Sequence, residues 1–368
     1  MRFMHTRLKT TLQLPIPAHH CTSPSHAGNI SQQHPALQPL HTFLSRASVK
    51  LLKTLVASHE LHPFSFASKN VLLPTLAFCY TQITTTDPTS SSSSSLSTPA
   101  AAATSPQTPA TTAAAAAAAA TDASASASSS SHSLFLIECM LFLQSVLRCV
   151  AYKQNPTGHV VGAAVASAEE MRGKLSGMAR QQLQGFFSQE KVVVLGGVLV
   201  QHYLVLTASD LEEWGSDPEV FYHEQGAVQW KDKLRPCAEA LLLLLFEQFK
   251  EVLSPALIDM LRQCIEACPP PASPDADVPV TPALLLKDAC YDAVGVACYD
   301  LHDVVDFKTW FTSALLPDMA CRHPNARILR RRAAWMVGQW VGKVEGDLCV
   351  PAYQALISLL PDEDLVVQ

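Results

Sequence analysis

Acidic side chains are concentrated in one polar stretch of the sequence, residues 207–229, which surrounds the tryptophan Trp214. The acids of this stretch are Asp210, Glu212, Glu213, Asp217, Glu219 and Glu224. Grouped carboxylates attract the basic surfaces of other proteins over long distances. The stretch is therefore either an acidic loop that contacts a partner, or a solvated connection in which Asp217 and Pro218 make a turn and Trp214 docks on the next helix.

A cluster of arginines follows about one hundred residues later. Its members are Arg327, Arg330, Arg331 and Arg332, which form the only dense basic cluster of the chain. These residues are candidates for contact with a partner; the alternative is that they pair with acids of neighbouring helices or face a concave surface. Trp335 and Trp340 follow at helical spacing and are predicted to lie in the core.

No residue pattern in the chain supports catalysis. The sequence contains no P-loop, no GxSxG, no HExxH and no GxGxxG after a strand. His302 lies close to Asp300 and Asp303, but at a predicted helix end, where it is expected to act as a cap. We therefore predict that the chain is not an enzyme, and we assign no catalytic, cofactor-binding or metal-binding residue.

The cysteines are scattered. There are 11 of them and no CxxC, and Cys264/Cys268 and Cys290/Cys298 fall at helix-like separations. Isolated cysteines on apolar faces behave as small buried hydrophobic residues, and their use here is typical of a reduced, intracellular chain.

The apolar residues that must position these groups recur with a helical period along most of the 368 residues. The predicted helices are residues 44–59, 71–83, 134–152, 167–187, 192–206, 230–250, 255–267, 284–301, 307–319, 326–341 and 348–360. No strand-like alternation bounded by hairpin signals occurs, so the fold class is all-α. Because each helix is apolar over a broad face, stacked helix pairs in an α-α superhelix are favoured over a single compact bundle.

Composition divides the chain into four parts. Residues 1–41 are rich in Pro and His and are predicted to be a disordered head, either a transit peptide or, as we favour, an artefact of the gene assignment. Residues 42–83 are predicted to be a helical repeat remnant, residues 84–133 a Ser/Thr/Ala/Pro low-complexity insertion, and residues 134–368 the main array of repeats.

Net charge and hydropathy exclude two classes of partner. Hydrophobic residues make up 48% of the chain and the formal charge is −6, which argues against a surface that binds nucleic acid. The apolar runs 134–150 and 192–206 are interrupted by polar residues and are shorter than the roughly 20 residues a membrane span needs. Neither nucleic-acid binding nor membrane insertion is expected.

The last segment, LISLLPDEDLVVQ, is similar to a HEAT repeat at the junction of its two helices. Asp362 lies at the Asp position of the repeat and Val367 at the Val position, while Gln368 stands where the repeat has Arg. The Asp would cap the second helix. Because an unpaired first helix would leave its apolar face in water, we expect the chain to be a fragment truncated within a repeat.

Two upstream passages resemble a particular family. HYLVLTASDLEEWGSDPEVF, residues 202–221, is similar to the Leu-Trp-x-x-Asp-Pro passage of importin-β-type receptors, carried here by Leu211, Trp214, Asp217 and Pro218. LRRRAAWMVGQWVG, residues 329–342, resembles the receptor helix that opens with arginines and continues Trp-x-x-Gly-Gln-Trp. With KLRPCAEALL, LLKDACYDAVGVACYDL and FKTWFTSALLPDM, these passages identify the chain as similar to the importin-β (karyopherin) family, importin-eleven branch.

The resemblance implies a HEAT-repeat solenoid that shuttles between nucleus and cytoplasm and imports protein cargo. Receptors of this kind bind FG-nucleoporins between outer helices and release cargo on binding Ran-GTP, without chemistry on the receptor itself. The Ran-binding N-terminal repeats of the family are expected to be missing from this chain. Two alternatives stay open: an export receptor of the same family, and a HEAT-repeat scaffold with no role in transport.

Overall fold

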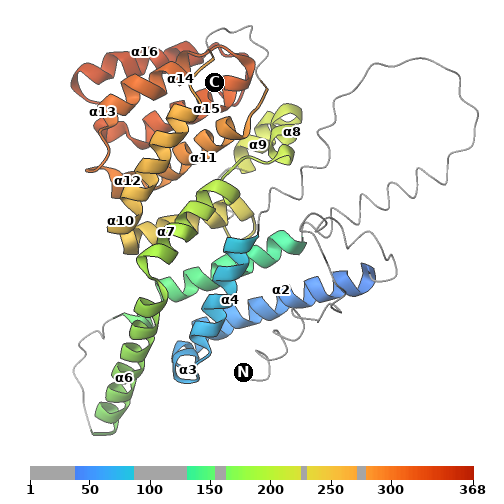
Figure 1. The fold of residues 1–368 in the computed structure, drawn as a ribbon, viewed down its shortest axis with the longest axis vertical. Helices are drawn as coiled ribbons and strands as arrows, with labels where there is room; N and C mark the ends of the chain where they lie inside the picture. The colour runs from blue at the N-terminus through green and yellow to red at the C-terminus, as the bar shows by residue number, and fades with distance from the viewer. Residues whose placement is uncertain (1–37, 87–130, 154–162, 225–229, 272–278) are drawn as a thin grey trace, which may run out of the picture. The chain divides into compact units, whose positions relative to one another are not determined.

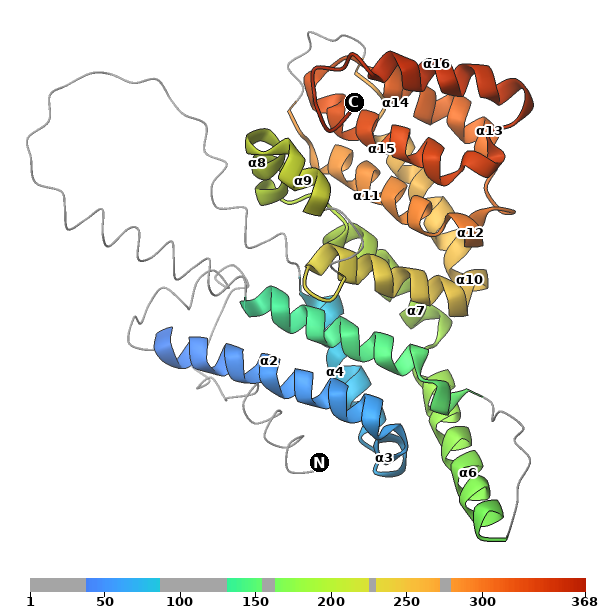
Figure 2. The ribbon, with the colours of Figure 1, turned by 180° about the vertical axis from the view of Figure 1, so that it is seen from behind.

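The computed structural model describes residues 38–86, 131–153, 163–224, 230–271 and 279–368, and every regular element in these ranges is helical (Figures 1 and 2). The all-α prediction is therefore confirmed. Most of the predicted head and most of the predicted low-complexity insertion lie outside the described residues. The chain divides into two compact units, which are described separately: Met1–Gln82 with Leu96–Gly185, and Ile83–Ser95 with Phe186–Gln368.

The described helices of the first unit are long, with one short exception. They are α2 (Gln38–Leu61), α3 (Pro63–Ser68), α4 (Leu72–Thr85), a helix of residues 131–148 that ends in the 3-10 turn Val150–Tyr152, and α6 (Ala163–Phe186). Buried His59 lies in its core, where its Nε2 is 3.1 Å from Tyr152 Oη and its Nδ1 is 2.9 Å from Ser145 Oγ. Burial lowers the pKa of His59 to about 4, so this histidine is a neutral core residue at pH 7.

The second unit begins with α7 (Gln189–Val198), which continues into the π-helical turn η5 (Leu199–Tyr203). The elements that follow are α8 (Ala208–Ser216), α9 (Pro218–Glu224), α10 (Leu234–Ala267), α11 (Pro282–Val296), α12 (Cys298–Leu301), α13 (Phe307–Trp310), the π turn η7 (Phe311–Leu315), α14 (Leu316–Ala320), α15 (Arg327–Gln339) and α16 (Cys349–Leu359), with short 3-10 turns at Pro324–Ala326, Val341–Lys343 and Gly346–Leu348.

Helices of the second unit pack mainly on helices that are close in sequence. α10 packs on α7 and α11, α11 packs on α15, and α14 packs on α15 and α16 (Figure 1). Burial of a leucine contributes about 1.5–3 kcal/mol, and α10 alone buries Leu241, Leu242, Leu244 and Leu245. This layered order is that of a solenoid, in which each helix is stabilised by its neighbours rather than by one common core.

Close approach of α11 and α15 depends on a glycine. A Cβ at Gly295 would overlap the ring of Trp335 and lie 2.8 Å from Met336 Sδ. Trp335 therefore rests directly on the backbone of α11, which a larger residue at position 295 would prevent.

The structure corrects the sequence prediction at residues 207–229, which we expected to form a loop. Two helices, α8 and α9, occupy most of this stretch. The start of α8 is stabilised by a capping box, since Thr207 Oγ1 accepts from the backbone N–H of Asp210, and Asp210 accepts from the N–H of Thr207. Asp217 ends α8 and Pro218 opens α9, so the expected turn separates two helices rather than two loop segments.

One predicted helix break is confirmed, and a second break was not predicted. The predicted helices 230–250 and 255–267 correspond to the two parts of α10, which meet at a kink where Phe249 has non-helical angles (φ −132°, ψ 27°), one residue before the predicted end at Lys250. The predicted helix 284–301 is interrupted at Ala297, which separates α11 from α12.

Within the described residues no single helix has both the length and the apolar character to cross a membrane, although one bent pair, Glu170–Phe186 with Gln189–Tyr203, reaches both together. α16 presents an apolar stripe of Val350, Tyr353, Ile357 and Leu360, whose exposed fractions are 62–64%.

Candidate partner-binding surfaces

Trp214 is the centre of a cluster that joins the two charged motifs of the sequence. Its side chain projects from α8 and is only 1% exposed. It stacks on Phe221 of α9 with ring centroids 4.8 Å apart. The guanidinium carbons of Arg327 and Arg331, on α15, lie 4.8 and 5.2 Å from the Trp214 ring. Such cation–π contacts each contribute about 0.5–2 kcal/mol, so these arginines hold the α8–α9 pair against α15.

Asp364, in the segment after α16, also contacts this group. We call the group the Trp214 cluster; its members are Trp214, Phe221, Arg327, Arg331 and Asp364. Trp214 Nε1–H donates to both carboxylate oxygens of Asp364, at 3.0 and 3.1 Å. Arg327 Nη1–H donates to Oδ2 of the same carboxylate at 2.8 Å. One carboxylate thus connects three separate segments of the second unit.

The acidic residues of α8 and α9 fall into two groups. Asp210 is turned inward, where its Oδ2 accepts from Arg235 Nη2 of α10 at 2.7 Å. Asp217 is exposed, and its Oδ1 accepts from the N–H of Val220 at 3.1 Å. Glu212 is exposed and Glu213 is half-buried.

Arg330 is held in a buried ion pair with Asp362. Its Nε and Nη2 donate to the two carboxylate oxygens at 2.7 and 3.2 Å, and its Nη1 donates to the carbonyl oxygens of Cys321 and His323. Burial by itself would raise the pKa of Asp362, but the hydrogen bonds from Arg330 and from the Asp364 N–H, with the charges of Arg330 and Arg322, together outweigh it and the pKa lies below its ordinary value. Asp362 also accepts from the N–H of Asp364 at 3.1 Å, in the region where we expected it to cap a second helix.

Arg332 lies deeper, between two acids of α11. Its Nε donates to Asp288 Oδ1 at 2.9 Å, and its Nη1 contacts Asp292 Oδ1. Burial opposes ionisation of Asp288, yet Arg332 and Arg331 lower its pKa below the ordinary value. Arg330 and Arg332 are thus paired with acids of neighbouring segments, which was the alternative to contact with a partner; contact through them stays a prediction.

A cavity of about 700 Å³, lined by both charged and apolar side chains, lies beside these pairs. It is lined by Tyr222 and His223 of α9, Glu239 of α10, Asp292 and Val296 of α11, Arg331, Arg332, Trp335 and Gln339 of α15, and Val366. Burial, and then the nearby charge of Asp292, raise the pKa of Glu239 to about 8, so this carboxyl is mostly protonated at neutral pH. Arg331 Nε and Nη2 are buried without a hydrogen-bond acceptor among the described residues, although Nη2 lies 3.9 Å from Asp288 Oδ1.

The remaining residues that the sequence singled out are structural. Trp340 is 2% exposed and stacks on Phe307 with centroids 5.4 Å apart, while Trp335 is half-buried against Gly295. His302 follows α12, lies parallel to the Trp340 ring, and contacts Asp303 Oδ1 at 3.2 Å.

The C-terminal valine that was assigned to the HEAT pattern is also buried. Val367 is 5% exposed, and its N–H donates to the carbonyl of Asp364 at 3.0 Å.

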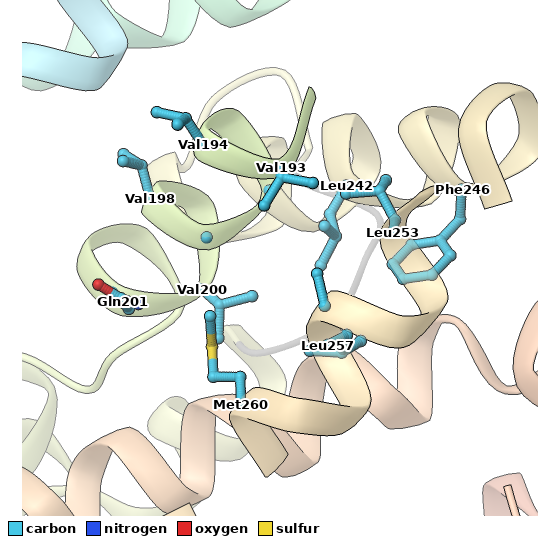
Figure 3. A pocket seen from close by; sticks show the side chains of 13 residues that line it. Val193, Val194, Val198, Val200, Gln201, Leu242, Phe246, Leu253, Leu257 and Met260 are labelled. Carbon is cyan, nitrogen blue, oxygen red and sulfur yellow. The ribbon is translucent and has the colours of Figure 1, made fainter. Parts of the chain in front are cut away.

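A second, apolar surface lies between α7 and α10. Figure 3 shows Val193 and Val200 pointing toward Leu242 and Leu257, with Met260 beside them. This apolar groove has a volume of about 340 Å³ and is lined by Val193, Val194, Gly196, Gly197, Val198, Val200, Gln201, Leu242, Phe246, Leu253, Ala256, Leu257 and Met260. An open groove with this lining suits an apolar side chain from another molecule.

Sequence reasoning missed the partners of the arginines and of Trp214. Asp288, Asp292, Asp362 and Asp364 lie in helices or segments far along the chain from the groups they pair with, by as much as 150 residues for Trp214 and Asp364. The only local signal was an acidic residue on an otherwise apolar helix, as for Asp288 and Asp292, because such a charge is buried only when it is paired.

In the described part of the chain, no group of three or more His, Cys, Asp or Glu is placed to hold a metal ion, and the groove is lined by apolar side chains. Fold and surfaces together define an all-α HEAT-repeat solenoid, a class of protein that binds other proteins.

Comparison with known proteins places the chain within this class. No protein-family model matches it. Over 236 residues the chain is 35% identical to importin-11 of Mus musculus and of Homo sapiens, a match that covers 64% of this chain and 22% of each relative. It is 27% identical over 213 residues to the importin beta-like protein KAP120 of Saccharomyces cerevisiae, covering 56% of this chain and 20% of that relative.

A solved structure gives the same result for the fold. The structure of Lph2, described as a novel bidirectional nuclear transport receptor in S. cerevisiae, matches 89% of this chain and 30% of that chain with a TM-score of 0.58 and 18% identity. By these comparisons the chain is importin-11-like and similar to receptors of the importin-β family. It spans about a fifth of the length of the curated relatives it matches.

Proposed function

We propose that the chain is part of a nuclear import receptor that carries protein cargo through nuclear pores and releases it on binding Ran-GTP. The observation that carries this proposal is the 35% identity to importin-11 over 236 residues. The HEAT-repeat solenoid supports it, because stacked helix pairs offer grooves and extended surfaces to protein partners without a catalytic centre.

We assign the apolar groove between α7 and α10 to a phenylalanine side chain of an FG-nucleoporin. Its valine, leucine and methionine lining would remove an aromatic ring from water, and burial of one such side chain contributes about 1.5–3 kcal/mol. Gly197 lies on the α7 side of the groove, where an added Cβ would be 3.8 Å from Met260 Cε and so meets no steric conflict.

This assignment is tested by filling the groove. Gly197→Leu places an apolar side chain in the groove, and we expect it to weaken binding of a fluorescent FG-repeat peptide to the chain by about 10–100-fold, in an anisotropy titration. Gly177→Leu, an exposed position of α6 with no atom within 4 Å of an added Cβ, is the matched control and should bind like the wild type. A peptide with Ser in place of Phe should not bind either protein, and equal affinity of Gly197→Leu and wild type would refute the assignment.

We further propose that cargo or Ran contacts the exposed acids of α8 and α9, Glu212 and Asp217, together with half-buried Arg327. The Trp214 cluster and the pairs of Arg330 and Arg332 would then hold this surface in position. Charge reversal at Glu212 and Asp217 should slow association with a basic partner more than it speeds dissociation.

The direction of transport is measured with Ran. A pull-down from cell extract with the tagged natural full-length protein, with and without GTP-locked Ran, distinguishes the three candidates. Loss of bound proteins with Ran-GTP supports import, and Ran-stimulated binding supports export. No response to Ran and no FG-nucleoporins among the bound proteins would leave the HEAT-repeat scaffold.

A further inference from the structure

Two cysteines that are far apart in sequence meet in the core of the second unit. Cys264 of α10 and Cys290 of α11 place their Sγ atoms 3.2 Å apart, across the contact between the two helices. Both are free thiols. A disulfide needs the sulfur atoms to close to about 2.05 Å, so a small movement of two side chains would join them.

The two thiols are not equivalent. Cys264 is 6% exposed, while Cys290 is fully buried at 0%. The hydrogen bond with Cys290 lowers the pKa of Cys264 against the opposing effect of burial, and nearby Lys287 lowers it further. The same hydrogen bond, together with burial, raises the pKa of Cys290. The more acidic and less completely buried thiol, Cys264, has the place of a reactive cysteine, and the fully buried Cys290 beside it has that of the resolving partner.

We propose that Cys264 and Cys290 are a redox modification site that forms a reversible disulfide in reaction with a peroxide. The Cys264 thiolate attacks one peroxide oxygen, the O–O bond breaks, and with one proton a sulfenic acid and water form. Cys290 gives up its proton and its sulfur attacks the Cys264 sulfur, so that the S–S bond forms and the sulfenic oxygen leaves as a second water. Two thiols are oxidised by two electrons and the peroxide is reduced to two waters.

The disulfide would connect the helix that forms one wall of the apolar groove to the helix that carries Asp288 and Asp292. It would close a loop between positions 26 residues apart in sequence. Because a cross-link restricts the unfolded chain more than the folded one, the oxidised protein should unfold at a higher temperature, by on the order of 5 °C.

The chain itself supplies a control pair. Cys139 hydrogen-bonds with Cys79 in the first unit, but both are 0% exposed, and burial raises the pKa of Cys139 well above its ordinary value. Because peroxide cannot reach these two sulfur atoms and burial makes the Cys139 thiol less acidic, we expect this pair to stay reduced.

The experiment exposes the folded chain to hydrogen peroxide, blocks the remaining thiols with an alkylating reagent, and maps the peptides by mass spectrometry. We expect a peptide pair joined through Cys264 and Cys290, two hydrogens lighter than the reduced pair, that disappears with dithiothreitol. Cys264→Ser and Cys290→Ser should each abolish it, and Cys79→Ser should not affect it. If Cys264 is oxidised only to sulfinic acid, if the pair stays reduced while other cysteines react, or if Cys79–Cys139 forms first, the proposal is wrong; the wild-type map decides even if a variant folds poorly.

Discussion

Replacement of Lys287 by methionine tests how the buried charges stabilise the second unit. Lys287 Nζ donates to Asp318 Oδ1 at 2.9 Å and to the carbonyl oxygen of Cys268 at 3.0 Å, and both charged side chains are only 1% exposed. Tyr291 Oη–H donates to the other carboxylate oxygen at 2.8 Å. Methionine keeps the length and the apolar stem of lysine but removes the ammonium, which leaves the buried Asp318 with the Tyr291 hydroxyl.

The expected loss is large because one charge stays behind. Removal of one member of a buried ion pair lowers the free energy of unfolding by about 3–5 kcal/mol, mainly through the unpaired charge. Burial already raises the pKa of Asp318, and loss of the ammonium will raise it further. A carboxyl whose folded pKa lies above its unfolded value loses stability as pH rises through that interval, so the effect of Lys287→Met should be largest at pH 7 and smaller toward pH 4.

Urea unfolding of the wild type and Lys287→Met, at pH 7 and at pH 5, provides the measurement. Intrinsic fluorescence reports the five tryptophans together, among them Trp310, whose ring centroid lies 5.5 Å from that of Tyr291, and circular dichroism reports the helices as a whole. The matched control is Lys308→Met, which removes an exposed pair with Asp347 (Nζ–Oδ2 2.6 Å) and should change little. If Lys287→Met were no less stable than Lys308→Met at pH 7, the buried pair would not have the role assigned to it.

Three further perturbations follow from the same unit. Glu239, with a pKa of about 8 against an ordinary 4.5, takes up a proton on folding at intermediate pH, so the wild type should lose stability from pH 5 to pH 8 and Glu239→Gln should show a flatter dependence of Tm on pH. Trp214→Phe removes the hydrogen bond to Asp364 and should lower the free energy of unfolding, measured in urea, by about 1.5–3 kcal/mol. Trp214→Tyr should be as unstable as Trp214→Phe, unless its hydroxyl reaches the Asp364 carboxylate. Gly295→Ala places a Cβ within the Trp335 ring and should cost about 1–3 kcal/mol, part of which Trp335→Leu should restore in the double variant.

The apolar periodicity of the sequence predicted the position of most helices. The apolar period over residues 44–59 and 348–360, for example, corresponds to α2 and α16. It failed at residues 207–229, where the exposed faces of two short helices made the composition look like a loop. The spacing of Thr207 and Asp210 was a capping signal that composition concealed.

The apolar pattern located one helix break and missed another. It predicts a helix that ends at Lys250 and a new helix from Pro255, and the backbone departs from helical angles at Phe249, next to the predicted end. The break at Ala297, between α11 and α12, was not predicted. Proline is tolerated in the first turn of a helix, so its position does not by itself fix where the preceding helix ends.

The sequence by itself determined the class of protein and the inventory of charges. Repeated helical periodicity without strand signals requires helices that stack, and the passages around Trp214 and Trp335 pointed to the importin-β family. These properties are encoded over spans of a few residues to a few tens of residues, where spacing alone fixes which side chains share a face.

Only the tertiary structure decided which charges meet. Arg330 finds Asp362 at a separation of 32 residues, and Trp214 finds Asp364 at 150. The contact of Cys264 with Cys290 and the open groove between α7 and α10 were likewise decided by the tertiary structure. Each of these contacts depends on the angle at which two helices cross and on how closely their backbones approach, as Gly295 allows for α11 and α15. The crossing angle is set by the combined shapes of two helix faces, and the sequence pattern of one helix does not contain that information.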